Sequence, residues 1–85
     1  MEDKARRIGV VSVIITDRKE SAHEVNDILT RHGGIIIGRM GLPYEPRHIS
    51  IIALIINGTT DEVGALTGQL GSLQGVEVKS ALARI

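Results

Sequence analysis

The sequence predicts an α+β fold in which a four-stranded antiparallel sheet carries two helices on one face, in the order β-α-β-β-α-β. Three observations predict it. Residues 8–15 and 49–56 are two long runs rich in Val and Ile, as strands require. Each run is followed by a segment whose apolar residues recur at helical spacing. A shorter strand-like segment follows each of these helical segments. At 85 residues, we expect one domain over residues 1–85.

The first half of the chain reads as strand, helix and strand. After the strand at 8–15 and a polar turn, one helical stripe is formed by Ala22, Val25, Ile28 and Leu29. Two capping-box spacings compete for the start of this helix, Asp17 with Glu20 and Ser21 with Glu24. The Gly33-Gly34 pair predicts its end, and residues 35–40 read as the second strand.

The second half repeats this order after a proline-containing loop. Pro43 and Pro46 predict that residues 41–47 lie outside any sheet ladder. Asn57-Gly58 is expected to end the third strand, and Thr59 with Glu62 forms a capping box for the second helix. The apolar stripe of that helix is Val63, Leu66, Leu70 and Leu73. A last strand is expected at 76–82. The complete order is the ferredoxin-like arrangement, with the first and third strands at the centre of the sheet.

The two central strands are apolar at both odd and even positions. Val10, Val11 and Val13 in the first strand, and Ile51 and Ile52 in the third, therefore point to both faces of the sheet. Two helices cover only one face, and monomers rarely expose large apolar patches. We therefore expect a homo-oligomer, a dimer or a tetramer, that packs through the second sheet face. The sequence leaves open which of the two sets of positions faces the helices; an exposed apolar face is the alternative.

Composition argues against several classes of protein. The chain has no cysteine, which excludes disulfides, thiolate zinc sites and cysteine-ligated iron–sulfur clusters. Ten Lys and Arg balance ten Asp and Glu, and Tyr44 is the only aromatic residue, so direct nucleic-acid binding is not expected. No apolar run is long enough to span a membrane, and the first residues do not resemble a signal peptide. The expected location is the cytoplasm.

Catalytic and metal-binding patterns are weak. No Ser or Thr stands in a nucleophile context, so we expect neither an enzyme nor a cofactor. His23 and Asp27 have the i, i+4 spacing of half a metal site, which His48 or a second His23 from another subunit could complete. Solvated surface residues are the simpler interpretation of all three. A metal-binding module with a site completed across subunits is nevertheless the alternative function.

The stretch from residue 38 to residue 47 is the most distinctive in the chain. Two prolines stiffen it, and Tyr44 is flanked in sequence by Arg39 and Arg47. A rigid tyrosine with nearby arginines is typical of a surface that binds a protein partner or a small ligand. The alternative is a stiff hairpin tip whose tyrosine covers the end of its own core.

Four stretches of the chain resemble one known family. Residues 38–44 (GRMGLPY) and 49–52 (ISII) resemble the small ACT-like proteins described as regulators of the iron-only hydrogenase system, and residues 24–29 and 65–76 are also similar to that family. The resemblance implies an ACT-like ferredoxin fold, similar to the ligand-binding domain of the nickel-responsive repressor. It also implies a non-catalytic regulatory role, as a sensor or assembly module.

The resemblance also implies where a ligand would bind. ACT domains often bind amino acids where the first strand meets the first helix, at a subunit boundary. The matching residues here are Thr16, Asp17 and Arg18, and they lack the glycine that is often found there. The nickel repressor also uses a cysteine, which this chain does not contain. We therefore expect no copied nickel site and no resident metal.

Overall fold

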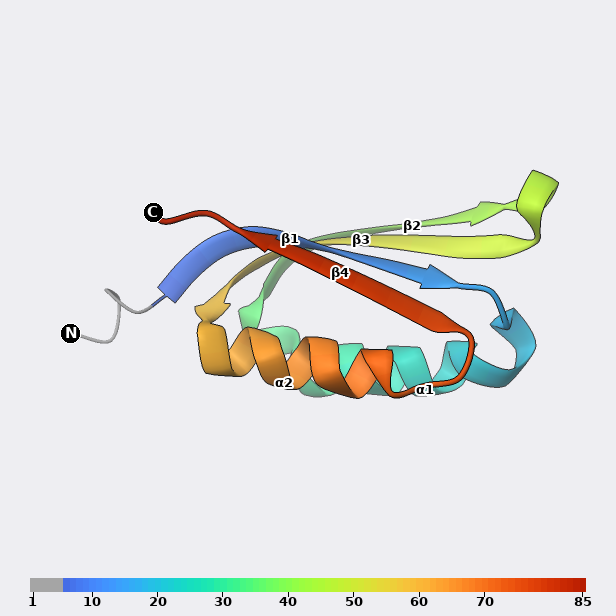
Figure 1. The fold of residues 1–85 in the computed structure, drawn as a ribbon, viewed down its shortest axis with the longest axis horizontal. Coiled ribbons are helices and arrows are strands. Elements are labelled where there is room, and N and C mark those ends of the chain that lie inside the picture. The colour runs from blue at the N-terminus through green and yellow to red at the C-terminus, as the bar shows by residue number, and fades with distance from the viewer. Residues whose placement is uncertain (1–5) are drawn as a thin grey trace.

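A computed structural model describes residues 6–85, apart from the side chain of Arg18, and shows a sheet layer packed on a helix layer (Figure 1). The elements in chain order are β1 (Arg6–Ile15), α1 (Arg18–Arg31), β2 (Ile36–Tyr44), β3 (Ile49–Thr59), α2 (Thr60–Gly71) and β4 (Val76–Leu82). Two short 3₁₀ turns, η2 (Gly33–Ile35) and η3 (Glu45–Arg47), flank β2. Both helices lie on the same face of the sheet, which confirms the predicted fold class.

The sheet is antiparallel throughout, with strand order β2-β3-β1-β4. The two most apolar strands, β1 and β3, are therefore central, as expected. They pair without interruption from Arg6↔Thr59 to Ile15↔Ser50. Since side chains alternate between faces along a strand, this single register decides which residues of both strands face the helices.

The core lies between the sheet and the helices. The buried positions of the central strands are Val11, Val13, Ile15, Ile52, Leu54 and Ile56. They pack against buried residues of α1 and α2, including Leu29, Leu66 and Leu70. This settles which set of positions points inward. Ile52 is in the core, whereas Ile51 points to the other face of the sheet.

Helix α1 uses the first of its two candidate start signals. The Asp17 side chain accepts a hydrogen bond from the backbone N–H of Glu20, with N and Oδ1 3.4 Å apart. Ser21 is instead buried, and its hydroxyl donates to the backbone carbonyl of Gln74 at 2.7 Å. The second capping-box spacing therefore marks a link between α1 and the segment before β4.

The predicted ends of β2 and β3 were wrong, because both strands are longer than expected. β2 continues through Pro43, which pairs with Ser50, to Tyr44, which pairs with Ile49. An edge strand tolerates proline because one row of its N–H groups has no sheet partner. β3 continues through Asn57 and Gly58, because β1 extends far enough to pair with them. A register shift between Ile36 and Gly38 marks an irregularity near the start of β2.

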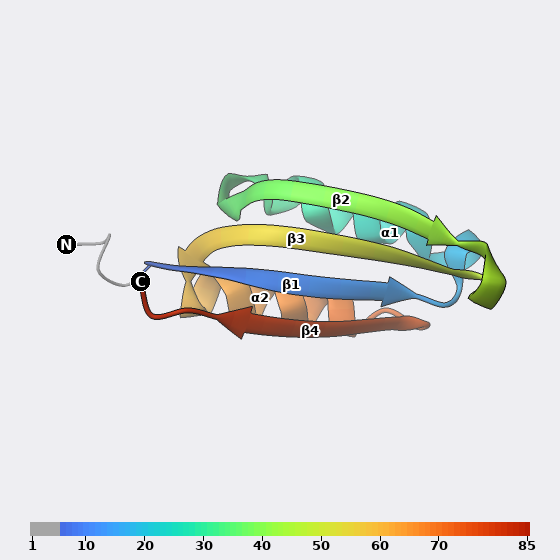
Figure 2. The ribbon, with the colours of Figure 1, turned by 90° about the horizontal axis from the view of Figure 1, so that it is seen from above.

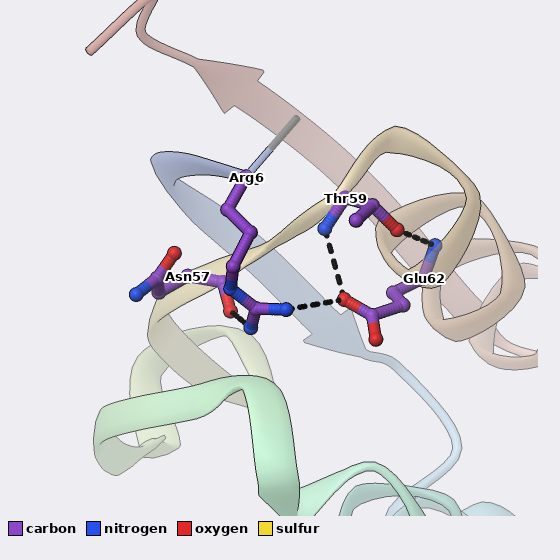
Figure 3. Close-up of polar contacts among 4 residues, drawn as sticks. All are labelled: Arg6, Asn57, Thr59 and Glu62. Atoms are coloured by element: carbon purple, nitrogen blue, oxygen red, sulfur yellow. Dashed lines mark hydrogen bonds and ion pairs between the residues drawn. The ribbon is translucent and has the colours of Figure 1, made fainter. Parts of the chain in front are cut away.

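Polar contacts fasten the start of α2 to β1 and β3 (Figure 3). The predicted capping box is present: the N–H of Glu62 donates to Thr59 Oγ1 at 3.1 Å, and the N–H of Thr59 donates to Glu62 Oε1 at 2.9 Å. Arg6 donates to the same Glu62 oxygen at 3.2 Å and also to the backbone carbonyl of Asn57. The backbone hydrogen bond from Thr59, together with the Arg6 charge, lowers the pKa of Glu62 below its ordinary value.

This lowered pKa predicts an acid-dependent loss of stability. A carboxylate whose pKa is lower in the folded state stabilises the fold above its unfolded value, about 4.3, and that contribution is lost as pH falls through the folded value. Urea unfolding should therefore show Glu62→Gln less stable than wild type near neutral pH, with the difference shrinking in acid. Thr59→Ala should cost about 1 kcal/mol in the free energy of unfolding. A wild-type-to-Gln difference that does not change with pH would contradict this account.

Candidate functional site

The second face of the sheet carries no helix, and Figure 2 views the molecule from that side. We call it the open face. Because directly paired residues of antiparallel strands point to the same side, the register identifies its members. From β2 to β4 they are Gly38, Met40, Leu42, Tyr44, Ile49, Ile51, Ala53, Ile55, Asn57, Ile8, Val10, Ser12, Ile14, Glu77, Lys79 and Ala81.

The open face is apolar across β2, β3 and most of β1. Five of its large apolar side chains are between 42% and 72% exposed: Val10, Met40, Leu42, Tyr44 and Ile55. Its polar side chains are Ser12 near the centre, Asn57 near the end of β3, and Glu77 and Lys79 on β4. Contiguous apolar surface of this kind is rare on monomers and is typical of interaction surfaces. The sequence-based expectation that a second apolar face exists therefore corresponds to a continuous surface in the structure.

The structure places Arg39 and Tyr44, both in the stretch from residue 38 to residue 47, on opposite faces of the sheet. Tyr44 lies on the open face at the end of the β2–β3 hairpin, opposite Ile49. Arg39 pairs with Leu54, so it points to the helix side, where its Nη2 donates to Asn26 Oδ1 on α1 at 3.2 Å. Arg47 is exposed in η3 at the hairpin tip. The fold thus does not bring Arg39 and Tyr44 together, and a binding role for the three residues stays a prediction.

Thr16 and Asp17 make local contacts at the junction of β1 and α1. The Thr16 backbone N–H donates to the Gly75 carbonyl at 2.7 Å, and the Thr16 hydroxyl reaches the same oxygen at 3.1 Å. Gly75 has φ +76°, and a Cβ there would lie 2.7 Å from the Cβ of Asp17. These contacts hold the turn before β4 against the start of α1. The side chain of Arg18 lies outside the described part of the structure, and ligand binding by this segment stays a prediction.

The histidines named as weak metal candidates lie in two different environments. His23 Nε2 is 3.4 Å from Asp27 Oδ2 along the exposed side of α1. His48 ends η3 with φ 55°, a left-handed conformation in which histidine is enriched among non-glycine residues. Among the residues that the structure describes, no three His, Cys, Asp or Glu side chains gather as metal ligands would.

A groove that sequence reasoning missed lies between α1 and the β2–β3 hairpin. Its volume is about 290 Å³, and its walls include Ile15, Val25 and Ile52. Gly41 and Pro43 also line it. Apart from the residues next to Gly41 in the sequence, no atom lies within 4 Å of where a Cβ at Gly41 would stand. Gly41, whose missing side chain leaves space at this position, was its signal in the sequence.

Comparisons with known proteins match this architecture. Residues 7–80 match the TM1266-like family model, described as "Iron-only hydrogenase system regulator, putative". The structure of the uncharacterized protein TM1266 from Thermotoga maritima superposes with a TM-score of 0.87 at 31% identity, covering 91% of this chain and 96% of that one. No curated protein sequence matches the chain.

Two further solved structures share the fold at lower identity. The ACT domain of GTP pyrophosphokinase from Chlorobium tepidum gives a TM-score of 0.75 at 17% identity, covering 89% of this chain and 99% of that one. The regulatory subunit of aspartate kinase from Thermus flavus gives 0.60 at 18% identity, covering 87% and 50%. The ACT-like fold is therefore confirmed. Within residues 6–85, no helix is long and apolar enough to cross a membrane.

The exposure of Tyr44 predicts a small effect on folding. Tyr44→Ala should lower the free energy of unfolding by less than about 1 kcal/mol, because the side chain is half exposed at a strand end. Leu54→Ala is the matched control on the same sheet, since Leu54 is 0% exposed, and should cost about 3 kcal/mol or more. Chemical denaturation at matched protein concentration measures both. Equal losses would show that Tyr44 belongs to the core.

Proposed function

This chain belongs to the family described as iron-only hydrogenase system regulators, and from that premise we propose that it is a non-catalytic regulatory module that works as a homo-oligomer. The proposed assembly surface is the open face. The proposed setting is the hydrogenase system that the family description names. The family membership supports the regulatory half of this proposal, and the open face supports the assembly half.

One observation carries the assembly half: the apolar character of the open face over adjoining strands. Burying a large aliphatic side chain is worth about 1.5–3 kcal/mol relative to leaving it in water. Val10, Met40, Leu42 and Ile55 are each about half or more exposed in the single chain. Covering them with a second copy of the same face would recover part of that energy. It would also leave the charged side of α1 in solvent.

The chemistry of the open face supports a regulatory role over catalysis. Ser12 is its only hydroxyl near the centre, and the ionisable groups of the face are Tyr44, Glu77 and Lys79. Lys79 is directly paired with Ser12, but no histidine lies among these members to form a nucleophile–base pair with an orienting group. The named neighbours include a regulatory subunit, which is consistent with this proposal. Neither the family nor these neighbours supports the metal-binding alternative.

The assembly proposal predicts an oligomer that one substitution disrupts. Wild type should be a dimer or larger by light scattering at micromolar concentration, and Ile55→Lys should be monomeric because a charge replaces an exposed apolar residue of the open face. Ala65→Lys on the exposed side of α2 is the matched control and should leave the oligomer intact. Circular dichroism should show both variants folded. A monomeric wild type would refute the assembly half.

We also propose that the groove beside α1 is where the module senses a small ligand. Strand β2 supplies Gly41, Leu42 and Pro43 to the groove lining, and Leu42 and Tyr44 also belong to the open face, so one strand contacts both sites. A ligand that shifts β2 would change the surface offered to a second copy. The groove is mostly apolar, with the Arg39–Asn26 pair beside it. A small apolar molecule with one polar group is the chemistry that this lining fits.

Native mass spectrometry tests the sensing proposal. Protein purified gently from its natural source should carry a small-molecule adduct. Gly41→Leu should lose it, because position 41 lines the groove and has room for a Cβ, so the leucine side chain would take up space that the ligand needs. Ala65→Lys should keep it. An adduct retained equally by Gly41→Leu would place the ligand elsewhere, and no adduct on any form would remove the support for sensing at this groove.

A further inference from the structure

We propose, resting on assembly through the open face, that two copies pack with a two-fold axis running across the strands, so that β4 lies over β4 and Glu77 pairs with Lys79 of the second copy. The register of the sheet, the sizes of the outward side chains and the placement of two charges carry this inference.

The outward side chains form rows across the four strands. One row, from β2 to β4, is Leu42, Ile51, Ile14 and Glu77. We call it the Ile51 row. The next row is Met40, Ala53, Ser12 and Lys79, which we call the Ala53 row. On the central strands the first row holds two isoleucines and the second holds alanine and serine. On the central strands the open face therefore has a row of large side chains beside a row of small ones. On β4 the two rows end in opposite charges.

Two-fold symmetry allows two simple ways to stack such a face on itself. The axis must lie in the plane between the two sheets, because it exchanges them. If it runs across the strands, β4 lies over β4 of the second copy, and each row meets a different row. If it runs along the strands, β4 lies over β2 of the second copy, and each row meets itself. Both keep the strands roughly aligned, as packed sheets prefer.

An axis across the strands and between the two rows makes the faces complementary. The Ile51 row of one copy then lies over the Ala53 row of the other. On the central strands Ile51 faces Ala53 and Ile14 faces Ser12, so a large side chain meets a small one, as close packing requires, while on β2 Leu42 faces Met40. At the end of the rows, Glu77 faces Lys79. Symmetry repeats each of these contacts, which gives two ion pairs in a dimer.

An axis along the strands and between β1 and β3 makes the same faces clash. Ile51 would face Ile14, and Ala53 would face Ser12, which leaves crowding in one row and a void in the next. Glu77 would face Leu42, and Lys79 would face Met40. Placing a charge against an apolar surface without a partner costs free energy. In the two rows on β1, β3 and β4, the arrangement across the strands avoids both costs.

Two further features agree with the axis across the strands. In the single chain, neither Glu77 nor Lys79 makes a hydrogen bond or ion pair through its side chain with any described residue, so both charges are available. One row further out, Tyr44 would lie over Gly38 of the second copy, and Ile49 would lie over Ile55. Gly38 has no side chain, and the nearest heavy atom to a Cβ built there is Ile55 Cδ1 at 3.7 Å. An aromatic ring can rest on such a position.

Charge reversal tests the orientation by analytical ultracentrifugation. Glu77→Lys sets two lysine side chains against each other twice per dimer, and Lys79→Glu does the same with two acids, so each should raise the dimer Kd about tenfold or more at low salt. The double variant Glu77→Lys/Lys79→Glu restores opposite charges and should return near the wild-type Kd. An equimolar mixture of the two single variants should form a mixed dimer more tightly than either variant alone. High salt should shrink all of these differences.

Enlarging one side chain of the open face gives a second test, because it should change the dimer affinity in opposite directions for the two orientations. Ala53→Leu should weaken the dimer across the strands, because the larger side chain would meet Ile51 of the second copy. It should strengthen the dimer along the strands, because it would fill the void above Ser12. Single charge variants that dimerise like wild type, or no preference for the mixed dimer, would overturn the proposed orientation. If Ile55→Lys still breaks the dimer in that case, the open face remains the interface and only the orientation fails.

Discussion

The uninterrupted antiparallel pairing of β1 with β3 is the constraint on which the rest of this molecule depends. It places two Val- and Ile-rich strands at the centre of the sheet, and its register sends Val11, Val13 and Leu54 to the helices. A slip of one residue would exchange the two faces of a strand, moving Val10 into the core and Val11 to the surface. Because both sets of positions are apolar, hydrophobicity alone opposes such a slip weakly. The flanking contacts of Arg6 with Glu62 and of Thr16 with Gly75 therefore matter for register as well as for loop position.

Local sequence signals predicted most of the fold, and the failures have a shared cause. The spacing of apolar residues indicated both helices, and the capping box at Thr59 and Glu62 placed the start of α2 correctly. The signal at Ser21 was left undecided and the one at Pro43 was misread, because the meaning of both depends on residues far away in the chain. Ser21 bonds to Gln74, and Pro43 is tolerated because β2 is an edge strand. Neither fact is available from a local window of sequence.

For the candidate site, too, the sequence predicted what local patterns determine and missed what depends on strand pairing. An apolar second face was predictable from β1 and β3, but its members were not, because isoleucines occupy both 51 and 52. The proximity of Arg39 and Tyr44 in sequence suggested a shared site, whereas their positions five residues apart along a strand place them on opposite faces. The groove beside α1 and the rows of large and small residues need the strand register, and they become visible only when partners such as Ile14 and Ile51 are known.

Proline in the edge strand also bears on how assembly can end. An exposed strand edge can accept another strand, and the added strand then offers a new edge, so growth by this route has no natural stop. Pro43 removes one backbone donor from the β2 edge of this sheet. Contact through a face behaves differently, because a two-fold pair consumes the very surface that made it and leaves nothing for a third molecule to extend. Pro43 thus discourages open-ended growth at the β2 edge, whereas the proposed assembly through the open face would limit itself.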